Sequence, residues 1–323
     1  MRRRVLLGAG VALLAAPARA QGLPAGFPSR PLTLVAPFTP GGPIDVLARV
    51  LGNGFQARGS AAATVDNRTG GGGTIGIDLV RRAAPDGTTM LVIPAGNLTI
   101  SPTITRNLPY DVERDFAPVS MMATTSNVIV AAAGSPIRSV QDLVAAARAR
   151  PDSISYGSSG VGSQLHLQME LLRSKAGIEI LHVPYRGTTQ ALTDLLGGRI
   201  QLLSSNLPVI LPGVREGRLQ AVAVTTARRV AELPDVPTLM EAGFDIDVTS
   251  WYGLLVPRAT PAPVVRAIAE ATEAVLRDPA TARSLAAQGL DIVAEPPEVF
   301  AARIRRETAL WAEVIRARGI TAE

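Results

Sequence analysis

The sequence predicts an α/β fold because one pattern recurs: a short apolar strand, a glycine-rich loop and then an amphipathic helix. The first copy is PLTLVAPFTPGGPIDVLAR, from Pro31 to Arg49. Two more strand units follow it before Asn97, and a second series of the same kind starts near Ser126. Consecutive βα units imply parallel strands, and open α/β sheets bind ligands at the carboxyl ends of such strands. The ligand site is therefore expected in these loops.

The first loop has the composition of an anion site. Apolar residues 32–35 form the strand, and Leu47, Leu51 and Phe55 recur at helical spacing. The loop between them, residues 39–43, reads TPGGP. Glycines allow close backbone approach, and a helix start leaves N–H groups unbonded with a partial charge of about +0.5. A carboxylate or phosphate fits there, although an ordinary βα turn is the alternative.

The second unit contains four consecutive glycines, Gly70 to Gly73, after a strand at residues 63–65. Ordering such a run costs much backbone entropy, so it indicates a close approach to a ligand or to neighbouring backbone. The spacing matches neither a dinucleotide fingerprint nor a P-loop. A third strand at residues 90–93 ends at PAGN, which places Asn97 at the loop edge.

The second series repeats the pattern with serines in the loop. A strand at residues 128–131 is followed by a helix that the S-x-x-D sequence from Ser139 to Asp142 caps. ISYGSSGVGS, residues 154–163, then leads into a helix and offers a second anion site. Ser163 by itself is most simply the N-cap of that helix. Strands are expected at 178–183, 200–203 and 219–224, and a helix at 192–196.

The last part of the chain turns extended at residues 245–256 and then forms two helices. Apolar residues from Val264 to Val275 mark the buried face of the first, and those from Phe300 to Ile315 mark that of the second. These helices could complete either series. Because no low-complexity linker separates the two series, strands that cross between them are expected in place of a flexible tether.

Residues 1–20 read as an export signal. Arginines precede an apolar run from Val5 to Ala16, and Ala18-Arg19-Ala20 has the form of a cleavage site. A mature periplasmic protein from Gln21 is expected, exported by the general or the twin-arginine route. The apolar run is shorter than the roughly 20 residues that span a membrane, so the mature protein should be soluble.

Charge and composition exclude several classes of function. Removing the signal takes away four arginines and no acid, so the formal net charge falls from +5 to +1. A nucleic-acid partner, which needs clustered basic residues, is not expected. The chain has no cysteine, which excludes disulfides and thiolate chemistry. Neither metal-ligand spacing nor a cofactor motif is present, and the length suits one large domain or two smaller ones.

The chain also resembles a known family, the Bug-type solute receptors of tripartite tricarboxylate transporters. The matching segments occur in family order from Arg30 to the C-terminus. They are PLTLVAPFTPGGPIDVLAR, VDNRTGGGGTIG, APDGTTMLV, LPYDVERDFAPVS, SYGSSGVGSQLHL, HVPYRGTTQALTDLLGGRI, ELPDVPTLMEAGF and WYGLLVPRATP.

The resemblance implies a periplasmic binding protein of type II-like fold, with two doubly wound α/β domains joined by two crossing strands and a ligand cleft between them. Domain 1 would comprise residues 21–124 and 248–323, and domain 2 the inserted residues 125–247. Such a receptor captures a small organic carboxylate and delivers it to a membrane permease. It performs no reaction on its ligand and needs no cofactor, and a monomer is expected.

The family's binding residues carry over by matching motif. One loop-to-helix pincer would hold a carboxylate in each domain, partly through ordered water, and three strand-end residues would face the same cleft. The domain 1 pincer is Thr39, Gly41, Gly42 and Asp45; the domain 2 pincer is Ser158, Ser159, Gly162 and Ser163; the strand-end residues are Asn97, Tyr185 and Asn206.

The chain departs from the family at residues 204–206, which read SSN where many relatives have Phe-Asp-Asn. The lost carboxylate makes an amino-acid ligand less expected, because an ammonium group needs an acidic partner. Which carboxylate binds is left open. A sensor that signals ligand presence to a membrane kinase is an alternative to a transport receptor.

Two residue types allow further interpretations. Asp45 would repel a carboxylate, so it either stabilises the helix start or holds a bridging water. His166, with Ser163 and Asp45, could imitate a hydrolase triad, but the chain lacks a G-x-S-x-G elbow. We therefore expect no catalytic residue, and expect replacement of His166 to alter binding little.

Overall fold

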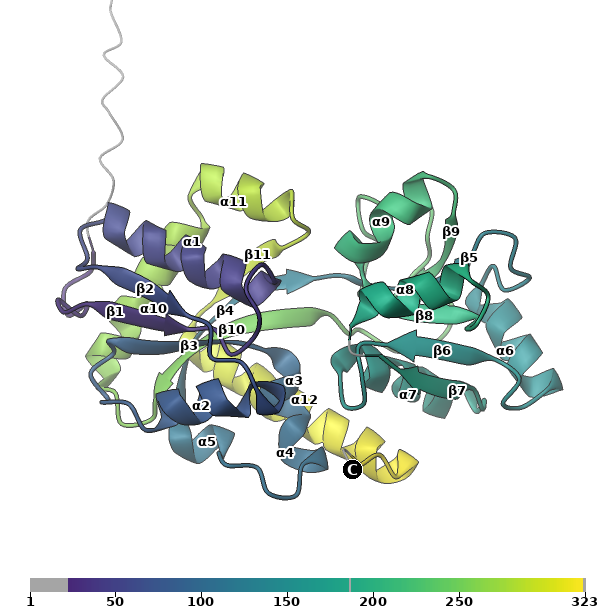
Figure 1. Ribbon diagram of the computed structural model, residues 1–323, viewed down its shortest axis with the longest axis horizontal. Helices are drawn as coiled ribbons and strands as arrows, with labels where there is room; N and C mark the ends of the chain where they lie inside the picture. Colours follow the sequence, from purple (N-terminus) through teal and green to yellow (C-terminus); the bar gives the residue numbers. More distant parts are fainter. Residues whose placement is uncertain (1–22, 186, 322–323) are drawn as a thin grey trace, which may run out of the picture.

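The computed structural model describes residues 23–321 except residue 186, and its strands form two separate sheets (Figure 1). The predicted signal lies outside the described residues. The first sheet has the order β11-β4-β10-β3-β1-β2, and its β1 pairs in parallel with β2 and β3. Its strands are β1 (Leu32–Val35), β2 (Ala63–Asp66), β3 (Thr89–Pro94), β4 (Phe116–Thr125), β10 (Ser250–Pro257) and β11 (Asp291–Glu295).

The second sheet has the order β7-β6-β8-β5-β9. Strand β6 pairs in parallel with β7 and β8, whereas β5 is antiparallel to β8 and β9. Its strands are β5 (Asn127–Ala132), β6 (Ser155–Ser158), β7 (Leu181–Pro184), β8 (Leu202–Asn206) and β9 (Leu219–Val224).

Helices cover the faces of both sheets, as expected for doubly wound α/β units (Figure 1). Those of the first are α1 (Pro43–Ala57), the 3-10 turn η1 (Gly71–Gly73), α2 (Thr74–Arg81), α3 (Ala95–Thr99), α4 (Ser101–Ile104), α5 (Val112–Asp115), α10 (Ala262–Leu276), α11 (Pro279–Ala286) and α12 (Pro297–Arg318). Those of the second are α6 (Val140–Ala149), α7 (Gln164–Ala176), α8 (Thr188–Leu196) and α9 (Leu207–Arg215).

The chain crosses between the sheets twice, at adjacent points. Strand β4 of the first sheet leads into β5 of the second through the single residue Ser126. The return enters β10, whose first residue Ser250 pairs with Thr125 of β4 and donates its hydroxyl to Asn127 Oδ1 over 3.0 Å. The predicted fold class, two α/β units joined by crossing strands, is confirmed.

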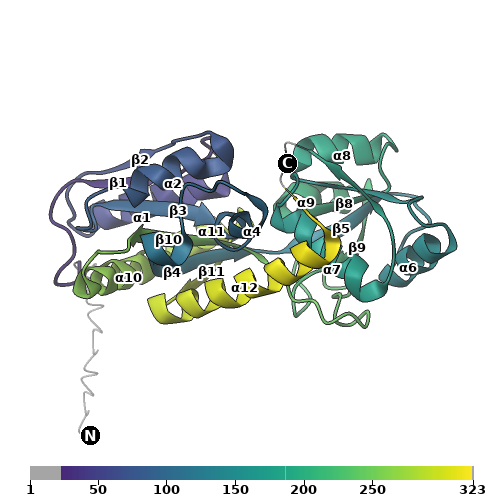
Figure 2. The ribbon, with the colours of Figure 1, turned by 90° about the horizontal axis from the view of Figure 1, so that it is seen from below.

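The last helix contacts both units. Phe300 and Ile304, in its first half, pack with Trp251 and the core of the first sheet. Trp311 and Ile315, in its second half, belong to the apolar core of the second sheet. Figure 2 shows α12 running from beneath the first sheet to α7. Along its length this helix thus completes both cores.

Several elements differ from the sequence-based expectation. The strand predicted at 178–183 begins only at Leu181, and the one predicted at 200–203 spans Leu202–Asn206. Strand β4 was not anticipated, since Pro118 interrupts its apolar run and proline normally marks a strand edge. Helix α9 was not anticipated either, because it contains Pro212 and proline disfavours a helix interior.

Candidate functional site

A cavity of about 500 Å³ lies between the two sheets, where loops of both units meet. Its lining comes from the first unit, from the second unit and from β10 between them. The lining residues are Phe38, Gly71, Gly72, Thr74, Pro94, Ala95, Gly96, Asn97, Ser101, Ile104, Thr105, Leu108, Ser159, Val161, Gly162, Ser163, Gln164, Leu165, Asn206, Ser250, Trp251 and Tyr252.

The polar groups of this lining are hydroxyls, amides and backbone groups. Among the described residues that line the cavity, none carries a formal charge at neutral pH. Three helices begin at the lining: α2 at Thr74, α7 at Gln164, and α9 directly after Asn206. Helix starts attract anions through free N–H groups and the helix dipole. The cavity can therefore bind an anion without a cationic side chain, and it offers no carboxylate to an ammonium group.

The loop after β6, residues 158–163, is held by bonds to uncharged groups. The Ser158 hydroxyl accepts the Gly160 N–H over 3.1 Å and lies 2.7 Å from Nε2 of His182. Ser163 Oγ donates to the Gly160 carbonyl over 2.7 Å and accepts the backbone N–H of His166 over 3.2 Å. Ser163 is therefore the N-cap of α7, as the sequence indicates.

Three of the four residues predicted in this loop line the cavity, namely Ser159, Gly162 and Ser163. Ser158 is fully buried behind them. Gly162 has φ +72° and donates its N–H to Nδ1 of His166 over 3.2 Å. A positive φ suits glycine, since other residues are strained in that conformation.

The loop after β1 closes instead on the Asp45 carboxylate. Asp45 is 5% exposed and accepts the Gly41 N–H over 3.0 Å, Nε of Arg49 over 2.9 Å and Nδ2 of Asn67 over 3.1 Å. The hydrogen bond from Arg49 outweighs burial, which acts in the opposite direction, and holds the pKa of Asp45 below its ordinary value. Of the two interpretations of Asp45, this geometry favours the structural one, in which the carboxylate stabilises the helix start and the loop before it.

The predicted residues Thr39, Gly41, Gly42 and Asp45 do not belong to the cavity lining, although Phe38 directly before them does. The glycine run before α2 takes their place there: Gly71 and Gly72 line the cavity together with Thr74. Contact of the 39–45 loop with a ligand stays a prediction.

The two predicted asparagines both line the cavity. Asn97 Nδ2 donates to the Gly72 carbonyl over 2.8 Å, which ties the glycine run to α3. Asn206 Nδ2 donates to Asn127 Oδ1 over 2.7 Å and to Ser250 Oγ over 3.1 Å. Asn206 thereby joins β8 to both chain crossings at the base of the cavity.

Tyr185 lies at the end of β7, outside the cavity lining. Its backbone N–H bonds to the Ser158 carbonyl over 3.2 Å, and its hydroxyl donates to Asp194 Oδ2 over 2.8 Å. Burial, together with Asp194, raises the pKa of Tyr185 to about 12. In this arrangement the ring packs beside α8.

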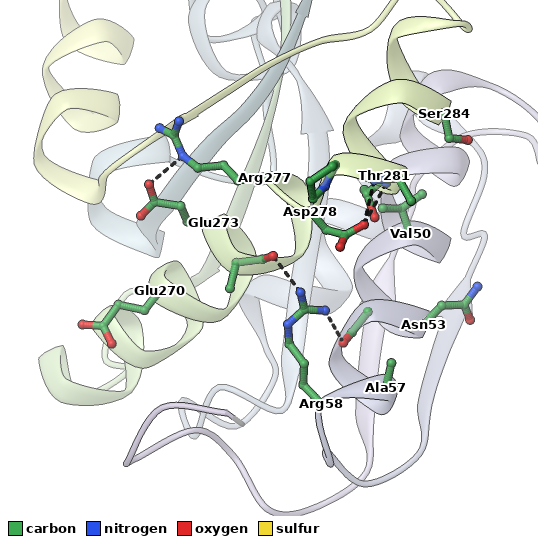
Figure 3. A pocket seen from close by; sticks show the side chains of 14 residues that line it. Val50, Asn53, Ala57, Arg58, Glu270, Glu273, Arg277, Asp278, Thr281 and Ser284 are labelled. Carbon is green, nitrogen blue, oxygen red and sulfur yellow. Dashed lines mark hydrogen bonds and ion pairs between the residues drawn. The ribbon is translucent and has the colours of Figure 1, made fainter. Parts of the chain in front are cut away.

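A larger hollow of about 1120 Å³ lies on the outer side of the first unit, between α1, α10 and α11 (Figure 3). Its charged groups bond mostly within the wall: Arg58 donates to the carbonyls of Gly54 and Ala274, and Arg277 pairs with Glu273. It receives no residue from the second unit. The cavity between the sheets is therefore the better candidate.

Comparison with known proteins gives the family. The model of the tripartite tricarboxylate transporter family receptor matches residues 47–320. This chain belongs to that receptor family.

Two relatives align along nearly the whole receptor. The UPF0065 protein in the tcbD-tcbE intergenic region of a Pseudomonas species is 38% identical over 97% of this chain and 94% of the relative. Protein BugT of Bordetella pertussis is 34% identical over 91% of this chain and 90% of its own length.

Two solved structures share the fold. An R. palustris protein solved with adipate has a TM-score of 0.79 and 34% identity, over 91% of this chain and 99% of that chain. MatC from Rhodopseudomonas palustris with bound malate has a TM-score of 0.75 and 28% identity, over 90% of this chain and 100% of that chain.

Members of the tripartite tricarboxylate transporter receptor family are periplasmic binding proteins and not enzymes. In this receptor the residues of the imagined triad bond elsewhere: Ser163 caps α7, His166 accepts the Gly162 amide and Asp45 binds Arg49. Within the described chain, no helix is long and apolar enough to cross a membrane.

Sequence reasoning missed several lining residues of this receptor. Gln164 lines the cavity, and its Nε2 donates to the Thr249 carbonyl over 2.7 Å, at the returning crossing. Trp251 and Tyr252 line it from the start of β10. The glycine run at residues 70–73 does carry a signal, since it indicates a close approach to a ligand or to neighbouring backbone, and Gly71 and Gly72 line the cavity. Gln164 directly follows Ser163, so the predicted loop could have indicated it. Trp251 carries no local signal, because only the crossing of the chain brings it to the cleft.

Proposed function

We propose that this receptor captures a small organic carboxylate that lacks an ammonium group, and passes it to the membrane permease of a tripartite tricarboxylate transporter. The observation that carries the proposal is the uncharged cavity onto which helix starts from both sheets open. Such a site compensates a carboxylate with N–H groups and hydroxyls. It leaves an ammonium group without a counter-ion.

The ligands named for similar structures support a carboxylate of modest size. Adipate and malate, the acids named for the two R. palustris structures, are both dicarboxylates. Apolar side chains of Ile104, Leu108, Val161 and Leu165 lie among the polar lining groups here. A diacid with an apolar middle suits this mixture.

In this proposal a signal at residues 1–20 directs the protein to the periplasm, where it acts as a monomer. Its two domains, residues 21–124 with 248–323 and residues 125–247, move relative to one another when the ligand binds. A ligand that bridges both units favours the closed state, because only that state completes both sets of contacts. The adjacent crossings at Ser126 and Ser250 are natural hinge points.

Calorimetry with the mature protein tests the ligand class. The panel contains adipate, malate, citrate, benzoate and glutamate, with adipamide as an uncharged control of the same shape as adipate. We expect at least one acid without an ammonium group to bind, and adipamide and glutamate to bind at least about a hundredfold more weakly, since each charged hydrogen bond contributes about 1.5 to 3 kcal/mol. A folded protein that binds none of these acids, or prefers glutamate, would contradict the proposal.

Transport assays test the delivery step separately. Cells that carry the permease should accumulate the acid only when this receptor is present.

Small-angle scattering tests the closure of the two domains. It should show compaction when the acid saturates the protein.

A further inference from the structure

We propose that His166 is a positioning residue for the carboxylate site: its Nδ1 holds the Gly162 amide and thereby fixes the loop that lines the cleft. This inference rests on the proposed function, because the loop concerned is the one expected to receive the carboxylate. His166 is 4% exposed and is not part of the cavity lining. Its effect on a ligand would therefore act through the loop.

A stacked pair of imidazoles holds the 158–163 loop at both ends. Gly162 donates its N–H to Nδ1 of His166 over 3.2 Å, and Ser158 Oγ lies 2.7 Å from Nε2 of His182. The two rings stack with centroids 3.8 Å apart and planes inclined by 16°. The ring of Tyr156 lies against both imidazoles, with its centroid 5.0 Å from that of His182 and 6.5 Å from that of His166. The rings have little room to move, so they fix the shape of the loop.

Three loop amides are occupied by these internal bonds. Gly160 donates to the Ser158 hydroxyl over 3.1 Å, and Ser163 donates to the Gly160 carbonyl over 3.2 Å. Gly162 donates to His166. These three N–H groups are not free for a ligand.

The remaining amides point to where a carboxylate binds. Within the described chain, the backbone N–H groups of Ser159, Val161, Gln164 and Leu165 have no hydrogen-bond acceptor, and all four residues line the cavity. Two of them are the first residues of α7, where the helix dipole favours an anion. By holding the Gly162 amide, His166 directs the anion to these four amides.

The positioning role of His166 requires that its imidazole be neutral, with the proton on Nε2. That nitrogen lies 3.7 Å from Glu170 Oε1. Glu170 is itself bonded by Nη1 of Arg173 over 2.6 Å and by Nε of Arg318 over 3.2 Å. Burial lowers the pKa of His166 to about 4, although the Glu170 charge acts in the opposite direction. At neutral pH, Nδ1 is therefore available as an acceptor.

Two substitutions separate the acceptor from the packing. His166→Asn keeps an oxygen close to the position of Nδ1, whereas His166→Leu fills similar space without an acceptor. Leu172→Val is the matched control, because Leu172 is buried on the same helix and belongs to the core of the second sheet. It should lower stability without touching the loop.

The first measurement needs no ligand. Amide exchange at Gly162, followed by NMR, should become about tenfold faster in His166→Leu, the effect of losing one hydrogen bond, and stay within about twofold in the other two variants. The nitrogen shifts of His166 in the unmodified protein should show a proton on Nε2 and none on Nδ1. Unchanged Gly162 exchange in His166→Leu, or a protonated Nδ1, would overturn the proposal. If His166→Leu does not fold, the nitrogen shifts and His166→Asn still decide.

The second measurement is the dissociation constant of adipate, or of the panel acid that binds the unmodified protein. It should rise about five- to tenfold in His166→Leu, the worth of one hydrogen bond, and stay within about twofold in His166→Asn and Leu172→Val. Equal affinity of His166→Leu and the unmodified protein would overturn the positioning role. If the unmodified protein binds no acid, the proposed function fails, while the exchange measurement still tests His166.

Discussion

The two glycine loops look alike in sequence but differ in the groups that bind their amides. The loop after β1 closes on a carboxylate, since Asp45 accepts the Gly41 N–H and the Arg49 guanidinium. The loop after β6 closes on neutral acceptors, the Ser158 hydroxyl and the His166 imidazole. A negative charge in the first helical turn stabilises the helix but weakens its attraction for a second anion. A strand, glycine loop and helix thus do not by themselves make an anion site.

The cavity reflects this difference. The loop after β6 contributes Ser159, Gly162 and Ser163 to the lining, whereas the loop after β1 contributes only Phe38. In the first unit Gly71 and Gly72 of the glycine run line the cavity together with Thr74, and the first turn of the helix that follows, α2, contains no acid.

The largest expected effect is on stability at mildly acidic pH, and it separates the neutral loop from the charged one. Burial lowers the pKa of His166 to about 4, and burial with the neighbouring His166 lowers that of His182 to about 3, against an ordinary 6.5. The unfolded chain therefore takes up protons near pH 6.5 and the folded chain does not. The free energy of unfolding should be highest above pH 6.5 and fall by on the order of 3 kcal/mol for each of the two histidines as the pH falls to about 4.

Urea unfolding at pH 7, 6, 5 and 4.5 measures this loss. Lowered carboxyl pKa values, as at Asp45 and Glu179, act mainly below pH 4.5, outside most of this window. The slope of the free energy of unfolding against pH, between pH 6.5 and 5, should be smaller in His166→Asn than in the unmodified protein. Equal free energies at pH 7 and pH 5 would show that the imidazoles titrate normally.

Asp45→Ala tests the charged loop. The change removes the acceptor of three hydrogen bonds from a site that is 5% exposed. Hydrogen bonds to a charged group contribute about 1.5 to 3 kcal/mol, so the free energy of unfolding should fall by about 2 kcal/mol. Asp142→Ala is the matched control. Asp142 occupies the same position in α6, where its carboxylate accepts the exposed Arg138 N–H and its own backbone N–H donates to Ser139 Oγ.

Urea unfolding should show a smaller loss of the free energy of unfolding in Asp142→Ala than in Asp45→Ala. Carboxylate affinity should change little in either variant if the loop after β6 is the main anion site. A loss in Asp45→Ala no larger than in Asp142→Ala would remove the structural role given to Asp45.

Much of the fold was accessible from the sequence because local patterns fix local elements. The apolar run at Leu32 and the helical spacing to Phe55 predict the first unit, and a serine directly before a helix predicts the Ser163 cap. The site was only partly accessible. Trp251 and Ser250 reach the cavity because the chain crosses twice between the sheets, and nothing local in their sequence encodes that meeting. Replacement of His166 was expected to alter binding little. Its bond to Gly162 depends on the geometry of the loop, which the sequence does not reveal.

Gly162→Ala and Gly42→Ala compare the two loops directly. Gly162 has φ +72°, and an added Cβ would lie 2.1 Å from Cδ1 of Ile104 across the cleft. Gly42 has φ −80° and would meet only the Thr39 carbonyl, at 3.8 Å. We expect a stability loss of about 2 kcal/mol at Gly162 and about 0.5 kcal/mol at Gly42, since a left-handed residue with a side chain costs about 1 to 2 kcal/mol.

Gly217→Ala is the control for backbone strain, because Gly217 has φ +68° with open space around its Cβ position and lies outside the cavity lining. It should lower stability and leave carboxylate affinity unchanged, whereas Gly162→Ala should weaken both. The two equivalent pincers that the family resemblance implies would lead one to expect weaker binding for bulky residues at both Gly42 and Gly162. Equal loss of affinity at those two positions would indicate that both loops bind the carboxylate.

The smallest effect separates a helix cap from a ligand group. Ser163 and Ser139 cap α7 and α6 in the same way, each accepting a backbone N–H three residues on. Loss of a serine cap costs about 1 kcal/mol, so Ser163→Ala and Ser139→Ala should lower the free energy of unfolding by similar amounts. Only Ser163 lines the cavity, so only its replacement should raise the dissociation constant in calorimetry. If both variants bind the acid as the unmodified protein does, the Ser163 hydroxyl serves the helix alone, and the second loop binds its anion through backbone amides.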